Sequence, residues 1–230
     1  MGVLKAADNA QQQGAGEMCA IEFGVAGGSG LIALEQCAEM VTRELGIKIQ
    51  VCGFDAGSGL PELCGDYRDH PDQWMPLDYA MDEAALRRRL RPTTNLILGN
   101  VADTVPQFVA EQQSAPVGFV SFDMDLYSST AAALQIFSRT DRNMLRRTIL
   151  YFDDVDFDCS HKFAGELLAI QEFNERNEQV KIDRWRSCRK QCVFKDNPWI
   201  DKMYVAHDLE AISNVQLGRQ PDQETCSLKI

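Results

Sequence analysis

The stretch MCAIEFGVAGGSGLIALEQCAEMVTRELGIKIQVCGF, residues 18–54, contains a complete strand–helix–strand unit. Residues 18–24 are a short apolar run that ends in glycine, which is typical of a buried strand. Residues 31–45 place apolar side chains at helical spacing, and Gly46 follows in the position of a C-cap. Residues 47–54 form a second apolar run. A helix between two buried strands predicts that the strands pair in parallel.

The same alternation continues outward from this unit. After a long loop over residues 56–79, we predict helices over 82–90, 103–113, 128–138 and 163–174, and strands over 95–98, 117–122, 148–152, 180–186 and 202–206. Strands of this kind alternating with helices indicate an α/β fold, in which a doubly wound, mostly parallel sheet is covered on both faces. Ligands of such sheets bind beyond the carboxyl ends of the strands, so the residues that follow each strand are the first site candidates.

Composition limits the classes of function. The chain has 230 residues, and we predict a flexible, loosely packed N-terminus over 1–16, a single domain over 17–210 and a tail over 211–230. A formal charge of −11 argues against nucleic acid as a partner, and the basic run 87–91 is interpreted as the solvated end of a helix. The eight cysteines are scattered and no apolar run approaches membrane-spanning length, so we expect free thiols, a cytoplasmic location and no membrane partner.

The glycine-rich loop after the first strand fits two ligand patterns. Residues 28–33 match the G-x-G-x-x-A pattern of dinucleotide-binding proteins. Glu22, Gly24, Gly28 and Gly30 together match the acidic-then-glycine loop of S-adenosylmethionine enzymes. An acidic side chain is awkward beside a pyrophosphate, but it suits a ligand that carries an ammonium and a sulfonium. A simple packing turn between strand and helix is the third interpretation.

Polar residues also follow the second and third strands. Asp55 could accept hydrogen bonds from both hydroxyls of a ribose, although an Asx-turn or an N-cap would use the same side chain. Asn100 could bond the edge of an adenine. We predict that Asp103 caps the next helix, and that Ser128 or Ser129 caps the helix after the fourth strand.

Four aspartates follow the fourth and fifth strands, in the segments FDMDLYSST and YFDDVD. Adjacent parallel strands would bring Asp123, Asp125, Asp153 and Asp154 into one small volume, where their charges repel and raise pKa values unless a cation intervenes. Mg²⁺ takes carboxylate oxygens as ligands, so a magnesium site is the economical explanation. The alternative is that some of these acids favour the N-termini of the following helices.

The chain resembles the macrocin-type O-methyltransferases in five segments, which follow the family's order over about residues 18–175: EFGVAGGSG, GFDAGSGLPE, GNVADTVPQF, FDMDLYSST and YFDDVD. These enzymes are class I S-adenosylmethionine-dependent proteins that methylate sugar hydroxyls in macrolide and aminocoumarin biosynthesis. The helix HKFAGELLAIQEFN is more similar to that of bacterial members with unassigned substrates. The resemblance implies a Rossmann-like sheet of seven strands and methyl transfer to a hydroxyl of a small sugar or natural-product molecule.

The resemblance also implies roles for individual residues. Cofactor contacts would come from Glu22, Gly24, Gly28, Gly30, Asp55, Asn100, Val101 and Asp123. Mg²⁺ would be held by Asp123, Asp153 and Asp154, and Asp125 would be the general base for the acceptor hydroxyl. The chemistry is coherent, because a metal lowers the pKa of a bound hydroxyl and a positioned carboxylate removes the proton.

Three features depart from the family. Ala56 and Ser58 replace the usual polar residues of the second-strand loop, and Asn100 stands where an acid is common. The glycine loop begins near residue 24, whereas the antibiotic enzymes carry a longer N-terminal section that helps to cover the site. A cover is therefore expected from residues 65–79, which include Tyr67, His70 and Trp74, or from the partner subunit of a homodimer.

Three other classes of protein stay open. Phosphatases of the haloacid-dehalogenase type also combine Asp-x-Asp with a later Asp-Asp, but a lysine is expected between these motifs and residues 126–152 contain none. A nicotinamide-dependent oxidoreductase would use the loop 28–33, yet no Tyr-x-x-x-Lys motif accompanies it. A methyltransferase-like module that binds without catalysis is the third alternative.

Overall fold

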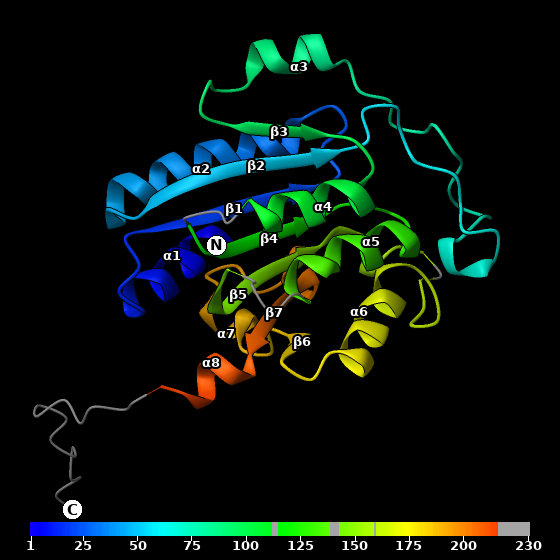
Figure 1. Ribbon diagram of the computed structural model, residues 1–230. Coiled ribbons are helices and arrows are strands. Elements are labelled where there is room, and N and C mark those ends of the chain that lie inside the picture. The colour runs from blue at the N-terminus through cyan, green and yellow to red at the C-terminus, as the bar shows by residue number, and fades with distance from the viewer. Residues whose placement is uncertain (112–114, 139–142, 159, 216–230) are drawn as a thin grey trace, which may run out of the picture.

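A central sheet of seven strands organises the computed structural model, which describes residues 1–111, 115–138, 143–158 and 160–215 (Figure 1). The strands are β1 (Glu17–Phe23), β2 (Lys48–Asp55), β3 (Asn95–Leu98), β4 (Val117–Phe122), β5 (Met144–Phe152), β6 (Val180–Arg184) and β7 (Met203–Asp208). Their order is β3-β2-β1-β4-β5-β7-β6, and β7 runs antiparallel to both of its neighbours while β1 to β5 are parallel. The predicted doubly wound, mostly parallel sheet is confirmed.

Helices cover both faces of the sheet and create two hydrophobic cores. On one face lie α1 (Gly2–Gln12), α2 (Ser29–Leu45) and α3 (Glu83–Arg89), and on the other lie α4 (Val101–Ala110), α5 (Tyr127–Ala133) and α6 (Gly165–Arg176). The short helices α7 (Cys188–Gln191) and α8 (Leu209–Ser213) accompany the edge formed by β6 and β7. Because both faces are covered, side chains of β1 are buried at consecutive positions, as the apolar run predicts.

The N-terminal segment is a packed helix, so the prediction of a flexible N-terminus over 1–16 is wrong. Helix α1 buries Val3, Ala6, Ala7 and Ala10 against the core that α2 shares. The side-chain amide of Asn9 also donates to the carbonyl of Arg147 on β5, at 3.1 Å. The small alanine side chains give a weak apolar signal in the sequence, and their burial depends on the sheet surface that they contact.

Two predicted helix caps are also wrong. The N-cap of α4 is Asn100, whose side chain accepts from the N–H of Ala102 at 2.9 Å, and Asp103 is the third residue of the helix, within its first turn. The N-cap of α5 is Leu126. Two residues further on, the N–H of Ser128 donates to Oδ1 of Asp69 at 2.8 Å. A carboxylate distant in sequence thus accepts from a free N–H group at the start of the helix in place of a local cap.

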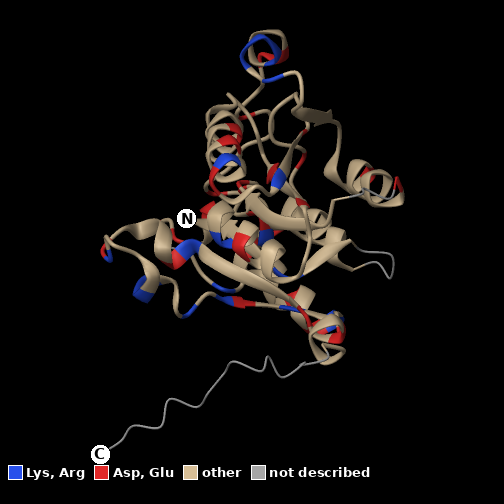
Figure 2. Cartoon of the chain, turned by 90° about the vertical axis from the view of Figure 1, so that its left-hand side faces the viewer, with Lys and Arg blue, Asp and Glu red and all other residues tan. Residues whose placement is uncertain are grey.

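The basic run predicted from the sequence lies at the exposed end of α3. The basic residues Arg87, Arg88 and Arg89 occupy the last turn of α3 and are exposed, which agrees with their interpretation as a solvated helix end. Figure 2 shows this helix at the top of the molecule, with Lys and Arg in blue. Within the described ranges, no helix has both the length and the apolar character needed to cross a bilayer.

Candidate active site

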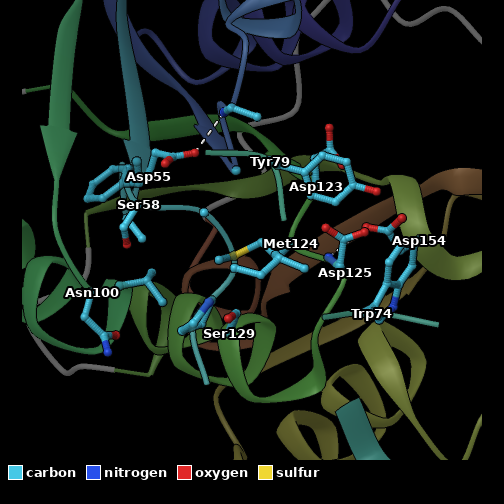
Figure 3. Close-up of a pocket in the computed structure, with 18 of the residues that line it drawn as sticks. Asp55, Ser58, Trp74, Tyr79, Asn100, Asp123, Met124, Asp125, Ser129 and Asp154 are labelled. Atoms are coloured by element: carbon cyan, nitrogen blue, oxygen red, sulfur yellow. Dashed lines mark hydrogen bonds between the residues drawn. The ribbon is translucent and has the colours of Figure 1, made fainter. Parts of the chain in front are cut away.

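A cavity of about 560 Å³ opens at the carboxyl ends of strands β1 to β5 (Figure 3). It lies where the strand order reverses between β1 and β4, which is the usual ligand position in an open α/β sheet. Five aspartates line it, together with backbone from the glycine loop and aromatic side chains from the loop after β2: Asp55, Asp123, Asp125, Asp153 and Asp154. Predicted candidates from five strand ends therefore meet in one cavity.

The glycine loop and β4 approach each other closely. Gly24 has a φ of +81°, and a Cβ at this position would lie 1.7 Å from the carbonyl oxygen of Asp123. A glycine is required by this contact as well as by the backbone angle. The cavity wall, as the described residues form it, includes Gly24 but not Glu22, Gly28 or Gly30.

Glu22 supports the loop from below. Its side chain is 5% exposed, its Oε2 has no hydrogen-bond partner among the described residues, and a Cβ on Gly30 would lie 1.9 Å from its Oε1. Burial, followed by the charges of Asp123 and Asp55, raises the pKa of Glu22 to about 8. Gly28 is the N-cap of α2 and contacts Leu86 of α3, so these residues shape the loop while Gly24 reaches the cavity.

Asp55 at the end of β2 joins two loops. Its Oδ2 accepts hydrogen bonds from the N–H groups of Val25 and Ala26, each at 2.8 Å, and its Oδ1 accepts from Gly57 at 2.6 Å. A carboxylate has about four acceptor positions, so the capacity to accept a ligand hydroxyl remains. The Asx-turn interpretation is correct for the bond to Gly57, and it coexists with a position in the cavity wall.

Asn100 and Val101 line the cavity beyond β3. Figure 3 shows Asn100, Ser58 and Asp55 on one side of the cavity and Asp125, Asp154 and Trp74 on the other. The Oδ1 of Asn100 is engaged by the N–H of Ala102, which leaves its amide N–H₂ as the group that can meet a ligand.

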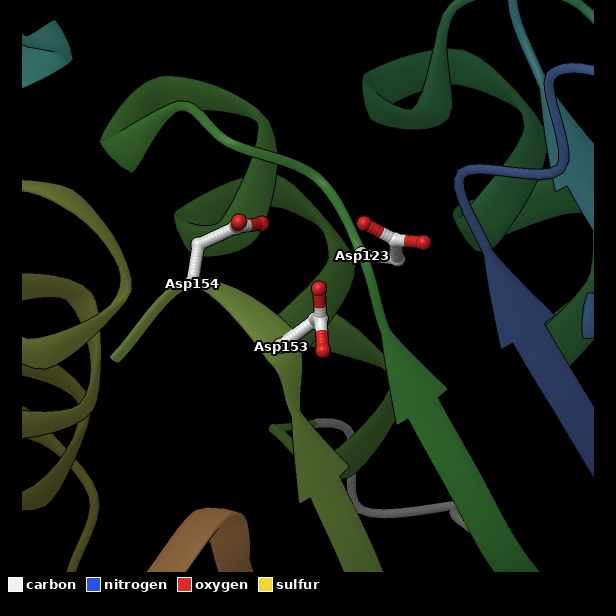
Figure 4. Close-up of side chains that lie close together, drawn as sticks. All are labelled: Asp123, Asp153 and Asp154. Atoms are coloured by element: carbon white, nitrogen blue, oxygen red, sulfur yellow. The ribbon is translucent and has the colours of Figure 1, made fainter. Parts of the chain in front are cut away.

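The carboxylates of Asp123, Asp153 and Asp154 form a compact group (Figure 4). Each offers one oxygen, and these three oxygens lie within 4.8 Å of one another. Oxygen ligands at this separation, from a carboxylate-rich set, suit a hard divalent cation such as Mg²⁺. Asp123 follows β4 and the other two follow β5, as the pairing of these strands requires.

Burial and mutual repulsion raise the pKa values of the carboxyl groups in this part of the cavity. Loss of hydration, followed by the charges of Asp154 and Asp153, raises the pKa of Asp123 to about 7. Burial is also the largest cause that raises the pKa of Asp154 to about 6. For Asp125, burial followed by the charges of Asp154 and Asp123 raises the pKa to about 8. A bound cation would relieve these shifts, so the residues present fit a divalent metal.

Asp125 adopts a left-handed backbone, with a φ of +60°. Its N–H donates to Oδ2 of Asp154 at 2.9 Å, which ties the loop after β4 to the loop after β5. Its side chain is 8% exposed and lines the cavity beside the three clustered carboxylates. Asp125 is therefore separate from the three proposed metal ligands but shares their cavity.

Three residues that contact the carboxylate group are not identified as site residues from the sequence. Lys202 donates to Oδ1 of Asp153 at 3.0 Å, and the hydroxyl of Tyr151 donates to the same oxygen at 2.6 Å. Glu166 is fully buried, and its Oε2 accepts from the N–H of Asp154 at 2.9 Å. Lys202 directly precedes β7 and Glu166 lies in the first turn of α6, so only the tertiary fold brings them here. The sequence offers only indirect signals: Glu166 lies in the segment HKFAGELLAIQEFN and Tyr151 lies in YFDDVD, both of which carry the family resemblance.

The loop after β2 supplies the remaining wall. Trp74 and Tyr79 line the cavity, while Tyr67 is exposed outside the wall and His70 is buried. The ring of His70 packs against Phe157, with centroids 5.1 Å apart. The expected cover from residues 65–79 is therefore present in part, through one of its three named residues and through Tyr79 at its end.

Comparisons with known proteins agree with this fold. No protein-family model matches the sequence, and no protein of curated function matches it either. Among solved structures, the crystal structure of CalS11, a calicheamicin methyltransferase, matches with a TM-score of 0.60 and 18% identity over 90% of this chain and 77% of that one. The apo structure of CalS11, described as a TDP-rhamnose 3′-O-methyltransferase, matches with a TM-score of 0.50 and 18% identity over 90% and 78%.

The sheet order and these similarities define the class I methyltransferase fold, which is Rossmann-like. Its antiparallel β7 distinguishes it from the 3-2-1-4-5-6 parallel sheet of dinucleotide-binding proteins. At 18% identity the similarity concerns the fold alone, so function rests on the site of this chain.

Proposed function

We propose that this protein is a Mg²⁺-dependent O-methyltransferase that uses S-adenosylmethionine to methylate a hydroxyl of a small molecule. One observation carries the proposal: a single cavity places Asp55 and Asn100 at one side and the carboxylate group Asp123, Asp153 and Asp154 at the other. The cavity occupies the ligand position of its fold, and its two sides match the needs of a nucleoside and of a metal-bound hydroxyl.

The residues divide into two functions. Asp55, Asn100, Val101 and Gly24 would hold the cofactor, and Glu22 with Gly28 and Gly30 would shape the loop beneath it. Asp123, Asp153 and Asp154 would hold the metal. When bound, the cofactor supplies the methyl group and Mg²⁺ lowers the pKa of the acceptor hydroxyl.

Asp125 would accept the proton of that hydroxyl. Its carboxyl group lies in the cavity, and the bond from its N–H to Asp154 fixes its position relative to the metal group. Burial is the largest cause that raises the pKa of Asp125, and burial persists when a cation neutralises the neighbouring carboxylates, so this carboxyl group keeps a higher proton affinity than an exposed aspartate. Lys202 and Tyr151 would hold Asp153 in place through their bonds to its Oδ1.

The two enzyme alternatives meet difficulties in the fold. The Asp-x-Asp motif follows β4, whereas a phosphatase of the haloacid-dehalogenase type needs it after the first strand of the fold. The dinucleotide pattern at residues 28–33 should follow its strand directly, but it begins five residues after the end of β1, and the described cavity wall includes neither Gly28 nor Gly30. A binding module without catalysis is separated from an enzyme by measuring turnover.

Titration calorimetry with S-adenosylhomocysteine and with NAD tests the cofactor. We expect S-adenosylhomocysteine to bind with a micromolar Kd and NAD to give no heat of binding. Asp55→Ala should weaken S-adenosylhomocysteine by at least tenfold, and Asp72→Ala, in an exposed part of the loop after β2, is the matched control. Binding of NAD without binding of S-adenosylhomocysteine would reject the proposal.

A further inference from the structure

The charge of the cavity restricts the acceptor. Five aspartates line it, and none of the described lining residues is Lys, Arg or His. Lys202 contacts the group from outside the lining, where its ammonium bonds Asp153. Arg68, on the loop after β2, is paired with Asp66 at 2.9 Å. The described part of the chain thus offers an acceptor several carboxylates and no free cation in the cavity wall.

A bound Mg²⁺ would not reverse this balance. It neutralises two charges of the group Asp123, Asp153 and Asp154, while Asp125 and Asp55 stay in the wall. Asp78 adds a carboxylate beside the cavity, since it directly precedes Tyr79 and its carbonyl accepts from the N–H of Leu60 at 2.8 Å, and both of these residues line the wall. Opposite charges at a few ångströms attract strongly in a partly buried site, and like charges repel by a similar amount.

Aromatic and apolar side chains surround the acceptor side. Trp74 and Tyr79 line the cavity, and Figure 3 shows both on the side of Asp125 and Asp154. The indole Nε1 of Trp74 is buried, and no group in the described part of the chain accepts a hydrogen bond from it. In the same loop Met75 and Leu77 are 64% and 69% exposed, so apolar surface continues outward from the cavity. Carboxylates next to aromatic faces are a combination that recognises organic cations.

From these observations we infer that the acceptor is a cationic hydroxyl compound, an alcohol or phenol that carries an ammonium group, and not a nucleotide sugar or another anion. This inference rests on the proposed function. The hydroxyl would lie at the carboxylate group beside Asp125, and the ammonium would lie toward Asp78 and the ring of Tyr79. Asp78 is thereby assigned as a specificity-determining residue.

A cationic acceptor would differ in charge from the substrate that is named for CalS11. CalS11 is described as acting on TDP-rhamnose, whose diphosphate is anionic. A site for a diphosphate is expected to provide Lys, Arg or free backbone N–H groups of a helix N-terminus. The described wall of this cavity provides neither Lys nor Arg, and Asp125 and the nearby Asp78 remain in addition to the group Asp123, Asp153 and Asp154 that would hold the metal.

A charge series on one ring system tests the acceptor. Dopamine, 4-methylcatechol and 3,4-dihydroxyphenylacetate share a catechol and differ in charge by single steps from cationic to anionic. Thermal shift and methyl transfer would be measured on the full chain with Mg²⁺, with S-adenosylhomocysteine and S-adenosylmethionine respectively, and TDP-rhamnose would be included as a nucleotide sugar. We expect dopamine to exceed the anionic catechol at least tenfold in apparent affinity and in kcat/KM.

The variant Asp78→Asn should reduce the ratio of dopamine to 4-methylcatechol by about fivefold or more, and Asp72→Asn in the same loop should leave the ratio unchanged. Equal or reversed order in the series, no response to dopamine, or methylation of TDP-rhamnose in preference to dopamine would overturn the inference. In each of these cases binding of S-adenosylhomocysteine would show that the proposed function still stands. Failure to bind S-adenosylhomocysteine would instead reject the proposed function itself.

Discussion

Asp125 combines a left-handed backbone with a buried carboxyl group, and this combination makes one substitution especially informative. Asparagine tolerates a φ of +60° nearly as well as aspartate does, so Asp125→Asn should preserve the loop and the bond from its N–H to Asp154. It removes the proton acceptor. We expect methyl transfer to fall about 10²- to 10⁴-fold, with the affinity for S-adenosylhomocysteine unchanged. Single-turnover assays and calorimetry on the same preparation would measure both.

The companion variant Asp125→Ala separates chemistry from strain. Alanine is less tolerant of the left-handed region, so this variant should lose activity and should also be less stable than Asp125→Asn, by about 1 kcal/mol. If Asp125→Asn retained wild-type turnover, the role of general base would have to pass to another carboxylate of the cavity.

Glu22 gives a prediction for the dependence of stability on pH. Its pKa is about 8 in the folded protein and near its ordinary value of 4.5 in the unfolded chain, so the folded state binds more protons between these values. The stabilising effect of the protonated form is complete below pH 4.5 and is lost as the pH rises through 8. Glu22→Gln has no carboxyl group to ionise, so it removes this loss of stability at high pH. Its free energy of unfolding relative to wild type should therefore rise by about 3 kcal/mol from pH 5 to pH 8.5.

Urea unfolding in metal-free buffer would provide these free energies. The exposed Glu44→Gln is the matched control, and it should follow the wild-type pH profile. Parallel profiles for Glu22→Gln and wild type would show that Glu22 is ionised in the folded protein, contrary to its buried position.

At the scale of elements, α1 is part of the core and its contacts define a test. Ala6 is fully buried between α1 and the sheet, whereas Leu4 on the same helix is 45% exposed. Ala6→Asp would bury a charge without a partner and should lower the free energy of unfolding by about 3 kcal/mol or more. Leu4→Asp should change it by less than about 1 kcal/mol. Chemical denaturation of both variants checks this, and equal effects would contradict the packing of α1.

The sequence predicts those elements that have a strong period or a buried apolar run. Strands β3 and β4 have the predicted bounds, and the other strands differ by a few residues at their ends. Helix α1 was missed because its core contacts are made by small alanines between polar residues, and the cap of α5 was missed because Asp69 acts from 59 residues away. Local patterns contain no information about such partners.

The same division holds in the cavity. Strand ends can be located from the sequence, so Asp55, Asp123 and Asp154 could be named before their positions were known. Lys202 and Glu166 could not, because they reach the cluster through the pairing of β5 with β7 and through the start of α6. Residues that reach a site through strand pairing can be identified only when the topology of the sheet is known in addition to the sequence.

At the scale of the whole molecule, the protein concentrates negative charge where its sheet opens. The chain carries a formal charge of −11, and five aspartates share a single cavity. Folding brings these charges together, so the cavity opposes the stability that the two cores provide. A divalent cation that binds the folded state alone would reverse this effect through mass action.

One substitution at the metal group should therefore have opposite effects on stability with and without metal. Because Asp123→Asn removes a repelling charge, it should raise the melting temperature by a few degrees in metal-free buffer at pH 8, where wild-type Asp123, with its pKa near 7, is mostly ionised. Because it also removes a metal ligand, it should lose most of the stabilisation that Mg²⁺ gives to wild type. Differential scanning calorimetry with MgCl₂ and with NaCl at equal ionic strength separates binding from screening. Asp72→Asn, an exposed acid of the same charge, should behave as wild type in both salts; equal responses to the two salts in wild type would exclude a specific magnesium site.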